Sequence, residues 1–486
     1  MRVARLAALL ALAVVIAVAV ASRSGSASSS PTDRAQFDAS LRSHLRLSGI
    51  HKIRHIVIIM QENRSFDNYF GTYPRADGIP GLAGHRGKVP CIPDPGEHCV
   101  RPFHDRHDLN AGGPYGFHTA QEVIDGGKMD GFIRQEEKRK YRGTPPDDVM
   151  GYHTGKDIPN YWKYAHDFVL QDHMFGSVAS WSLPSHLFLT SLWSARCTQH
   201  NDPASCTNVP GYPPPPPGWK GAKAPIYAWT DLTYLLHEHH VSWRYYMFNG
   251  TEPPCISNTT QSCAPVTNGP QSASIWYPLK WFDTVRNDHQ TKNIQSVKHL
   301  FAAATGGTLP AVSWVVPNYL VSEHNLDARI SPGQTYVTGL INTLMRGPEW
   351  RSTAIFLSWD DWGGFYDSAV PPKVDENGYG LRVPGLVISP YAKRGYIDHQ
   401  TLSFDAYAKF IEDDFLNRAR LDPSTDGRPD PRPDVRENAP QLGDLVKDFN
   451  FNQRPRKRVI LPVHPKTDLI EPTNALGGPS SAFGWG

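Results

Sequence analysis

Two short acidic motifs stand close behind apolar stretches of the sequence. Glu62 and Asn63 come one residue after the stretch HIVIIM, and Asp360 and Asp361 directly follow the stretch AIFLSW. Carboxylate and amide oxygens are the ligands that hard divalent cations prefer. Adjacent aspartates also repel each other unless a cation or protons neutralise them. Either motif alone could be a helix cap or a solvated turn, but the two together favour a metal site.

A segment rich in hydroxyl groups supplies candidate nucleophiles. Six serine or threonine residues lie between Ser177 and Ser191, ends included. Ser182 is the candidate within the run Trp-Ser-Leu-Pro-Ser-His, although spacing alone does not distinguish it from Ser180 or Ser185. A hydroxyl held beside a divalent cation is activated for attack on phosphorus.

Histidines could bind phosphate oxygens or protonate a leaving group. The candidates are His118, in a polar Gly-rich stretch, and His324, in the run Ser-Glu-His shortly after an apolar stretch. Any one of the 21 histidines is more often an ordinary surface residue. The adjacent His239 and His240 end a Leu-rich helical pattern, which indicates a solvated helix C-terminus rather than a phosphate clamp.

Strand and helix patterns alternate along the chain. Short apolar runs rich in β-branched and aromatic residues predict buried strands at 55–60, 243–248, 312–316, 354–359 and 383–389. Apolar residues at helical spacing predict amphipathic helices at 336–346 and 404–415. This alternation predicts an α/β fold with a mostly parallel sheet. In such sheets ligands bind beyond the carboxyl ends of the strands, where both acidic motifs stand.

The N-terminal residues have the pattern of an export signal. Residues 1–21 combine basic Arg2 and Arg5, a long apolar run, and the small residues Ala-Val-Ala before a cleavage point after Ala21. The alternative is an uncleaved membrane anchor, for which the run is short. Residues 22–50 are predicted to be a Ser-rich linker and N-terminal extension. Cleavage would remove two basic residues and leave equal numbers of basic and acidic residues, so nothing indicates nucleic acid as a partner.

Six cysteines fall into three close pairs, Cys91/Cys99, Cys197/Cys206 and Cys255/Cys263. Six cysteines allow 15 pairings, but closing a short loop costs the least chain entropy. The spacing therefore favours three local disulfides, which suits an exported protein. A zinc site is the weaker alternative, because the chain has no Cys-x-x-Cys spacing.

The stretch 55–73 (HIVIIMQENRSFDNYFGTY) closely resembles the opening motif of the bacterial phosphoesterase family, which comprises the non-haemolytic phospholipases C and related secreted acid phosphatases. Further blocks resemble the same family in the same order. They are 126–132 (GGKMDGF), 172–184 (DHMFGSVASWSLP), 322–324 (SEH), 358–366 (SWDDWGGFY) and 382–396 (RVPGLVISPYAKRGY). The resemblance runs from about residue 53 to 415 and again through 444–462.

The resemblance implies an alkaline-phosphatase-like fold, a three-layer α/β/α sandwich, here with loop insertions closed by cysteines. In the family's acid phosphatases one metal ion is held by a Glu-Asn pair, a nucleophilic hydroxyl and an Asp-Asp pair. The matching positions here are Glu62, Asn63, Ser182, Asp360 and Asp361. The implied cofactor is one divalent ion, for which oxygen ligands fit Ca²⁺, Mg²⁺ or Mn²⁺, and Zn²⁺ can also take carboxylates.

The family also implies two histidines that contact phosphate. His324 stands about 36 residues before the Asp-Asp pair, at the place of one of them. For the other, upstream of the GGKMDGF block, His118 is the predicted residue, with His104 and His107 as alternatives.

The chain departs from the family pattern in places. Many relatives have Glu where Asp361 stands and His where Trp362 and Ser368 stand. Many phospholipases carry Pro-Asn-Arg after the nucleophile, whereas this chain has Pro-Ser-His, ending at His186. These departures bear on which residues could donate a proton and on whether the substrate is a lipid. They bear less on the prediction that a phosphoester is hydrolysed.

The sequence thus predicts a secreted, metal-dependent phosphoester hydrolase, extracellular or periplasmic. The favoured activity is that of a phospholipase C-like phosphodiesterase whose nucleophile is a metal-bound Ser182. The alternatives are a secreted acid phosphatase (a phosphomonoesterase) and an exported protein that binds a phosphate ligand without turnover. A phospholipid substrate would imply transient contact with a membrane surface, to which exposed aromatic residues of 197–278 could contribute if they do not pack internally.

The predicted domain organisation is a catalytic domain at 51–417 that includes a loop or cap insertion at about 197–278. It is followed at 418–486 by a linker and tail, of which the Pro/Asp/Arg-rich tract 418–436 is predicted to be exposed.

Overall fold

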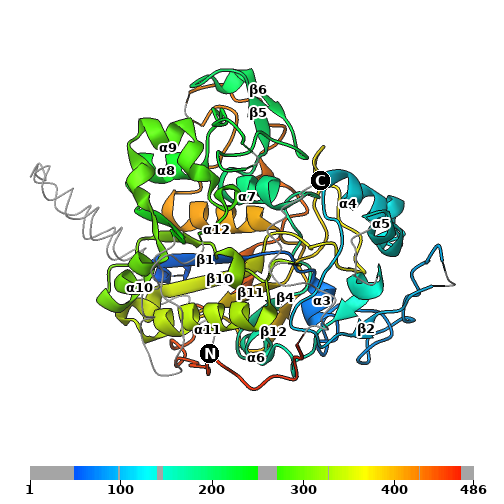
Figure 1. The fold of residues 1–486 in the computed structure, drawn as a ribbon. Helices are drawn as coiled ribbons and strands as arrows, with labels where there is room; N and C mark the ends of the chain where they lie inside the picture. The colour runs from blue at the N-terminus through cyan, green and yellow to red at the C-terminus, as the bar shows by residue number, and fades with distance from the viewer. Residues whose placement is uncertain are drawn as a thin grey trace, which may run out of the picture. The chain divides into compact units, whose positions relative to one another are not determined.

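A mixed sheet of eight strands lies at the centre of the fold (Figure 1). The computed structural model describes residues 49–96, 99–139, 146–219, 221–249, 271–326, 328–425 and 427–471. Across the sheet the strands follow in the order β12-β4-β11-β10-β1-β9-β7-β8. Neighbouring strands are parallel except where β11 pairs with β10 and with β4. The mostly parallel sheet predicted from the sequence is therefore confirmed.

The strands of this sheet are β1 (His55–Gln61), β4 (Val169–Gln171), β7 (Trp243–Met247), β8 (Ile294–Ser296), β9 (Val312–Val315), β10 (Thr353–Trp359), β11 (Gly385–Ile388) and β12 (Tyr396–Asp398). All five predicted strands are present, as β1, β7, β9, β10 and β11. Every residue of β1 and β10 is buried, as expected for central strands covered on both faces. The strands that the sequence did not reveal have three residues each, too few to show a periodicity.

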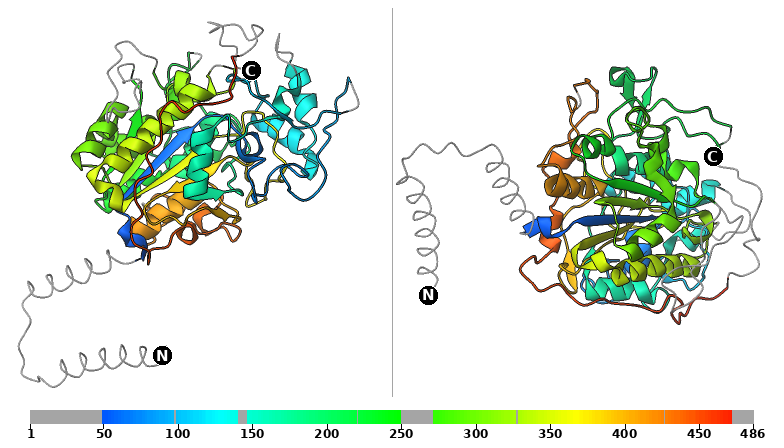
Figure 2. Two further views of the ribbon diagram at one scale, coloured as in Figure 1. Left: turned by 90° about the horizontal axis from the view of Figure 1, so that it is seen from below. Right: turned by 90° about the vertical axis from the view of Figure 1, so that its left-hand side faces the viewer.

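Helices cover both faces of the sheet and give the predicted three-layer α/β/α arrangement. Helices α7 and α12 lie on one face, and α6, α10 and α11 lie on the other (Figure 1 and Figure 2). The helices are α3 (Phe66–Phe70), α4 (Phe117–Ile124), α5 (Phe132–Arg139), α6 (Pro159–Asp167), α7 (Ser182–Ser191), α8 (Leu232–Glu238), α9 (Asp283–Asn287), α10 (Val297–Gly306), α11 (Ile330–Arg346) and α12 (Phe404–Phe415). Both predicted helices are confirmed, as α11 and α12.

Small elements connect these layers. Two short sheets pair β2 (Phe103–His104) with β3 (Gly151–Tyr152) and β5 (Ala195–Cys197) with β6 (Cys206–Asn208). The 3-10 helices are η1 (Gly49–Lys52), η2 (Asp125–Gly127), η3 (Pro146–Met150), η4 (Pro203–Ser205), η5 (Ser274–Trp276), η6 (Pro278–Trp281), η7 (Gln290–Asn293), η8 (Tyr319–Val321), η9 (Pro348–Ser352), η10 (Arg436–Asn438) and η11 (Leu445–Asp448).

Two of the three predicted disulfides are present, Cys91–Cys99 and Cys197–Cys206. Cys255 and Cys263 lie outside the described residues, as do the predicted signal peptide at 1–21 and most of the linker that follows it. Among the helices in the described ranges, none has the length and apolar character that a membrane crossing requires.

Residues 197–278 contribute a strand to the main sheet and are not simply an insertion that covers it. Strand β7 lies inside this range and pairs with β9 and β8 within the main sheet. The aromatic side chains of Trp229, Trp243, Tyr245 and Trp276 are buried in the main hydrophobic core. The prediction of a loop or cap insertion at about 197–278 is therefore wrong for the part of this range that contains β7. These four aromatic residues stabilise the core and present no surface to a lipid.

The tract 418–436 is only partly exposed, so the prediction of an exposed linker is wrong for its buried charged residues. The side chains of Asp430, Arg432 and Arg436 are buried. Arg436 binds Asp375 (Nη1–Oδ2, 2.7 Å) and Asp405 (Nε–Oδ2, 3.1 Å). Its guanidinium also donates to the backbone carbonyl of Ser177, shortly before α7. Sequence composition indicated a solvated tract, but each of these charged groups finds a partner from a distant part of the chain.

Replacing Arg436 by Ala should lower the free energy of unfolding by about 3–5 kcal/mol, because the substitution leaves the buried carboxylates of Asp375 and Asp405 without a counter-charge. Arg454 is exposed and makes a charge-matched control, for which the same substitution should change the free energy by less than about 0.5 kcal/mol. Urea denaturation followed by circular dichroism measures both. Equal effects for the two variants would contradict the structural role given to this segment.

Candidate active site

The two acidic motifs meet at the carboxyl ends of β1 and β10. These strands pair in parallel with Gln61 opposite Trp359, so the residues that follow them emerge side by side. The backbone amide of Asn63 donates to Asp360 Oδ1 at 3.0 Å, and the Asn63 side chain donates to Asp361 Oδ1 at 2.9 Å. The structure therefore brings together four of the five residues predicted to hold a metal, across nearly 300 residues of sequence.

The fifth, Ser182, is the first residue of α7. Its hydroxyl donates a hydrogen bond to Glu62 Oε2 at 2.9 Å. The structure also separates Ser182 from the other two candidate serines. Ser185 donates to the backbone carbonyl of Asp360 at 2.6 Å, and the buried hydroxyl of Ser180 has no hydrogen-bond partner in the described part of the chain. Of the three candidate serines, Ser182 alone places its oxygen against a carboxylate of this group.

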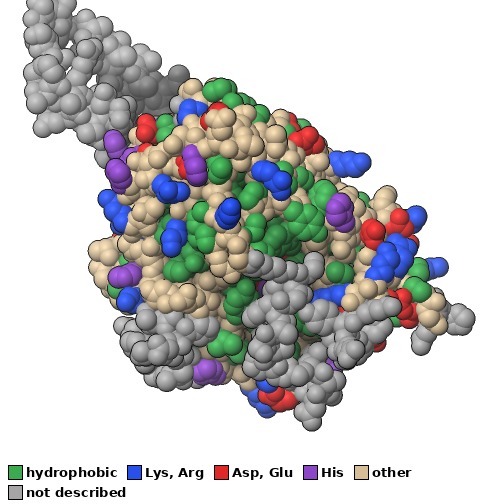
Figure 3. Space-filling model, turned by 45° about the horizontal axis from the view of Figure 1, so that its top comes forward, with side chains coloured by type: hydrophobic (Ala, Val, Ile, Leu, Met, Phe, Trp, Pro, Cys, Tyr) green, Lys and Arg blue, Asp and Glu red, His purple; other side chains and the backbone are tan. Residues whose placement is uncertain are grey.

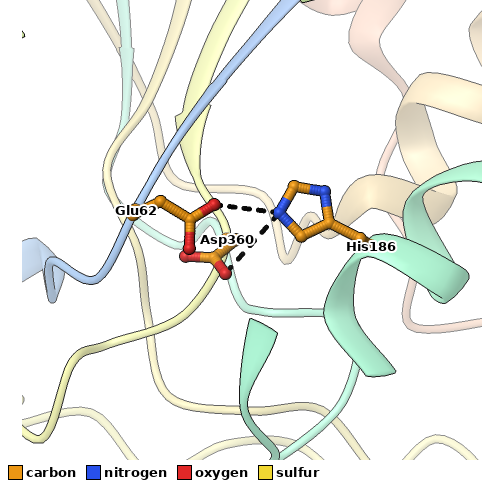
Figure 4. Close-up of side chains that lie close together, drawn as sticks. All are labelled: Glu62, His186 and Asp360. Carbon is orange, nitrogen blue, oxygen red and sulfur yellow. Dashed lines mark hydrogen bonds and ion pairs between the residues drawn. The ribbon is translucent and has the colours of Figure 1, made fainter. Parts of the chain in front are cut away.

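A histidine that the sequence analysis did not single out completes the group. His186 lies one turn after Ser182 on α7, and its Nε2 is 2.9 Å from Glu62 Oε1 and 3.7 Å from Asp360 Oδ2 (Figure 4). The spacing of four residues places both side chains on the same face of the helix. That spacing was the available signal, but it indicates a site only once α7 is known to begin at Ser182.

Three carboxylates, Glu62, Asp360 and Asp361, form what we call the acidic cluster, and all three are almost fully buried. Burial and the charge of Asp360 raise the pKa of Glu62 well above its usual value. Burial, and after it the charge of Asp360, also raise the pKa of Asp361 above its usual value. Burial lowers the pKa of His186 to about 4, so this imidazole is neutral near pH 7 and does not balance the charge. The acidic cluster therefore needs protons or a cation.

The oxygen atoms at this site fit a hard divalent cation. Within the described residues, the buried atoms Asn63 Oδ1, Asp360 Oδ2 and Asp361 Oδ2 accept no hydrogen bond. Buried polar atoms normally have partners, so a set of free acceptor oxygens beside repelling carboxylates is the arrangement that a cation would satisfy. Glu62, His186 and Asp360 also place ligand atoms within 4.8 Å of one another.

His186 fits the role of orienting Glu62 better than the role of metal ligand. When Glu62 is ionised, the Nε2 of the neutral imidazole must carry the hydrogen that lies between them. A histidine that binds metal usually donates its other ring N–H to a protein acceptor. The Nδ1 of His186 has no such partner in the described part of the protein.

The loop after Asp361 depends on glycine. Gly363 has φ +61°, and a Cβ atom there would lie 2.4 Å from the carbonyl oxygen of Asn63. Its amide donates to Asp361 Oδ1 at 2.7 Å, and its carbonyl accepts from the side chain of Asn325 at 3.0 Å. The glycine thus lets three loops approach closely and fixes the second carboxylate of the acidic cluster.

The predicted phosphate-binding histidines differ in their surroundings. His324 is buried, and its loop joins the site because the amide of Glu62 donates to the carbonyl of Ser322 at 3.0 Å. His118 is exposed on α4, where its ring neighbours are Phe117 and Tyr212.

The two alternatives to His118 have acidic partners of their own. His104 pairs with Asp157 at 2.7 Å, and His107 pairs with Asp105 at 2.7 Å. Within the described residues, none of these three histidines forms a hydrogen bond or ring contact with a residue of the acidic cluster.

Comparison with known proteins places this chain in a family. The sequence model of the Phosphoesterase family matches residues 53–416, and the chain belongs to this family. The match includes both strands that carry the acidic cluster and all of α7.

Several relatives are named as phospholipases C. The chain is 29% identical to the non-hemolytic phospholipase C of Burkholderia pseudomallei, over 85% of this chain and 61% of that protein. It is 26% identical to the non-hemolytic phospholipase C of Pseudomonas aeruginosa, over 77% of this chain and 56% of that protein. It is 27% identical to phospholipase C B of Mycobacterium tuberculosis, over 86% of this chain and 81% of that protein. The chain thus spans little more than half the length of the first two relatives.

A divalent cation should raise the midpoint of thermal unfolding, and should raise it more at pH 8 than at pH 5. Since the pKa values of Glu62 and Asp361 are raised on folding, the metal-free folded protein binds more protons than the unfolded chain. Its stability therefore falls as pH rises above the ordinary carboxyl range, while a cation competes better against fewer protons. Thermal scans of EDTA-treated protein with and without Ca²⁺, Mg²⁺, Mn²⁺ or Zn²⁺ measure this.

The variant Asp360→Asn is the control for this experiment. It removes one of three buried like charges, so without metal it should be at least as stable as the wild type, and it should lose most of the cation-dependent shift. A shift of full size in this variant would place the cation elsewhere.

Proposed function

We propose that this protein is an exported, metal-dependent phosphoester hydrolase with phospholipase C-like activity on phosphodiesters. The observation that carries the proposal is the hydrogen bond from Ser182 Oγ to Glu62 Oε2 within the buried acidic cluster. Membership of the Phosphoesterase family and relatives named phospholipase C support the reaction class. The signal-like N-terminus and the disulfides support export.

Ser182 is the proposed nucleophile, and its surroundings suit that role. Glu62 Oε2 already accepts the hydroxyl hydrogen and is placed to take that proton as Ser182 Oγ bonds to phosphorus. His186 holds the other carboxylate oxygen and so fixes the direction of Glu62. Ser182 also begins a helix of ten residues, and the positive end of the helix dipole favours negative charge on the phosphoryl oxygens.

Glu62, Asn63, Ser182, Asp360 and Asp361 would hold the divalent cation. When bound, it would supply positive charge that offsets the carboxylates and acidifies a neighbouring hydroxyl. The serine phosphoester formed by the first displacement would be hydrolysed by water in a second step, which returns the proton to the serine.

Contact with a lipid surface is part of the proposal. Tyr212 and Leu320 are exposed to 54% and 58%. Tyr212 follows Gly211, whose carbonyl accepts from the Trp181 indole beside Ser182, and Leu320 belongs to the η8 turn shortly before His324. Hydrophobic side chains gather near the centre of the face shown in Figure 3. Apolar groups beside the site would suit a substrate that is drawn from a membrane.

Replacing Ser182 by Ala should lower kcat by at least about 1,000-fold while the fold remains intact, because the variant lacks the nucleophile. Ser180→Ala is the matched control, since that buried hydroxyl lies two residues away and has no hydrogen bond to the acidic cluster. Near-wild-type turnover by Ser182→Ala, or an equal loss in both variants, would assign the nucleophile to another residue.

A substrate panel tests the reaction class. The metal-loaded protein should hydrolyse p-nitrophenyl phosphorylcholine and phosphatidylcholine with a higher kcat/KM than p-nitrophenyl phosphate. The opposite order would favour the acid phosphatase alternative. Phosphate binding without turnover of any of the three would favour the non-catalytic alternative.

A further inference from the structure

Tyr115 is a buried residue in the loop before α4, close to the proposed site. It precedes the first turn of α4, and its side chain is 9% exposed. Its hydroxyl lies 3.0 Å from His324 Nε2, and the two rings meet edge to face with centroids 6.0 Å apart. One buried partner of His324 is thus a tyrosine, three residues before the exposed His118.

The direction of this hydrogen bond follows from the second ring nitrogen of His324. His324 Nδ1 lies 2.7 Å from the backbone carbonyl of Asn325, which can only accept. Nδ1 therefore carries the hydrogen, and in the neutral ring Nε2 is an acceptor. Tyr115 consequently donates its phenolic hydrogen to His324.

The surrounding loops hold this pair rigidly. Glu323, with φ +68°, turns its carboxylate into the core, where it accepts hydrogen bonds from Tyr69, Tyr161 and Trp359. Asn325 donates to the backbone carbonyls of Ala111 and Gly363, each at 3.0 Å. The loops that carry Tyr115, His324 and the acidic cluster are therefore joined to one another.

Tyr115 also lies close enough to the acidic cluster for the charges of Asp361, Asp360 and Glu62 to affect its phenol. Its ring meets the ring of Trp362, the residue after Asp361, at a centroid distance of 6.5 Å and an interplanar angle of 87°. Burial raises the pKa of the Tyr115 phenol well above its usual value, and the charge of Asp361 raises it further, against an opposing effect of Arg139. The phenol therefore keeps its hydrogen at physiological pH and acts as a donor.

We propose that Tyr115 and His324 form a proton relay that serves the departing alcohol, a proposal that rests on the phosphoester hydrolase function proposed above. His118 and His324 were the candidates to bind phosphate or protonate a leaving group, and the relay assigns the protonation to Tyr115, supported by His324. In the state described, both nitrogens of His324 are engaged, so the ring reaches a substrate through Tyr115.

The relay needs one further proton on His324, which is taken up from the solvent and is balanced over a turnover by the proton that the hydrolytic water releases in the second step. Both ring nitrogens then donate, Nδ1 to Asn325 and Nε2 to the oxygen of Tyr115, and the phenolic hydrogen is free to turn to the substrate. As the P–O bond breaks, its electron pair leaves with the alcohol oxygen, which takes the phenolic hydrogen. The Nε2 hydrogen moves to Tyr115. The products are a neutral alcohol, a neutral imidazole and a neutral phenol, so no charge is left on the pair.

Dependence on the leaving group tests the relay. p-Nitrophenolate departs without protonation, whereas the alkoxide of a diacylglycerol needs a proton. Tyr115→Phe should therefore lower kcat/KM by about 100-fold or more on dihexanoyl phosphatidylcholine below its micelle concentration, and by less than about 10-fold on p-nitrophenyl phosphorylcholine. If the wild type accepts only monoesters, glycerol phosphate and p-nitrophenyl phosphate form the equivalent pair.

Tyr366→Phe is the matched control. Tyr366 is 5% exposed and belongs to the same hydrophobic cluster as Tyr115 and Trp362, so removing its hydroxyl should leave both rates unchanged. An equal loss on both substrates, or no loss on either, in a Tyr115→Phe variant of wild-type thermal stability would overturn the relay and leave the hydrolase function standing. Failure of the wild-type enzyme to hydrolyse any of these esters would instead overturn the proposed function.

Discussion

The parallel pairing of β1 with β10 is the constraint on which the rest of the site depends. Because the two strands end in register, Glu62 and Asp360 must emerge at neighbouring points of one sheet edge. Their buried carboxylates repel, and only a few groups moderate this repulsion. Asp360 Oδ1 accepts from the amides of Asn63 and Asp361, and Asp361 accepts from Gly363 and the Asn63 side chain. These donors fix the carboxylates in place but leave their charge uncompensated, which makes a cation part of the expected working state.

Much of the framework could be predicted from the sequence, for a physical reason. Strands β1 and β10 are buried on both faces, so they appear as unbroken apolar runs, and polar residues directly after such runs must lie at the edge of the sheet. Glu62 and Asp360 could be found in this way. His186 and Tyr115 could not, because their positions depend on where α7 begins and on how the loop before α4 packs against His324. The four-residue spacing of Ser182 and His186 gains meaning only once α7 is known to begin at Ser182, and the position of Tyr115 has no local pattern in the sequence.

The tract 418–436 is a second place where the sequence could not predict the structure. Its composition is typical of a solvated linker, yet its charged groups are bound by distant partners. Arg432 donates to the carbonyl of Ser191 at the end of α7, and Arg436 donates to that of Ser177 before its start. The helix that carries Ser182 is thus held at both ends by residues outside the family match, which ends at residue 416. Local periodicity cannot reveal contacts of this kind, because they join residues more than 200 positions apart.

Gly363, which follows Asp361 and Trp362, affects how a match to the motif Asp-Asp-Trp-Gly-Gly should be interpreted. Any side chain at Gly363 would collide with the backbone of Asn63, so glycine is demanded there by the crossing of two loops whether or not the protein turns over a substrate. A pattern search keyed to Asp-Asp-Trp-Gly-Gly therefore selects partly for steric fit. A pseudoenzyme that had lost its carboxylates could retain the glycines and still match, so the acidic positions, together with a serine at the start of the facing helix, are the better diagnostic of chemistry.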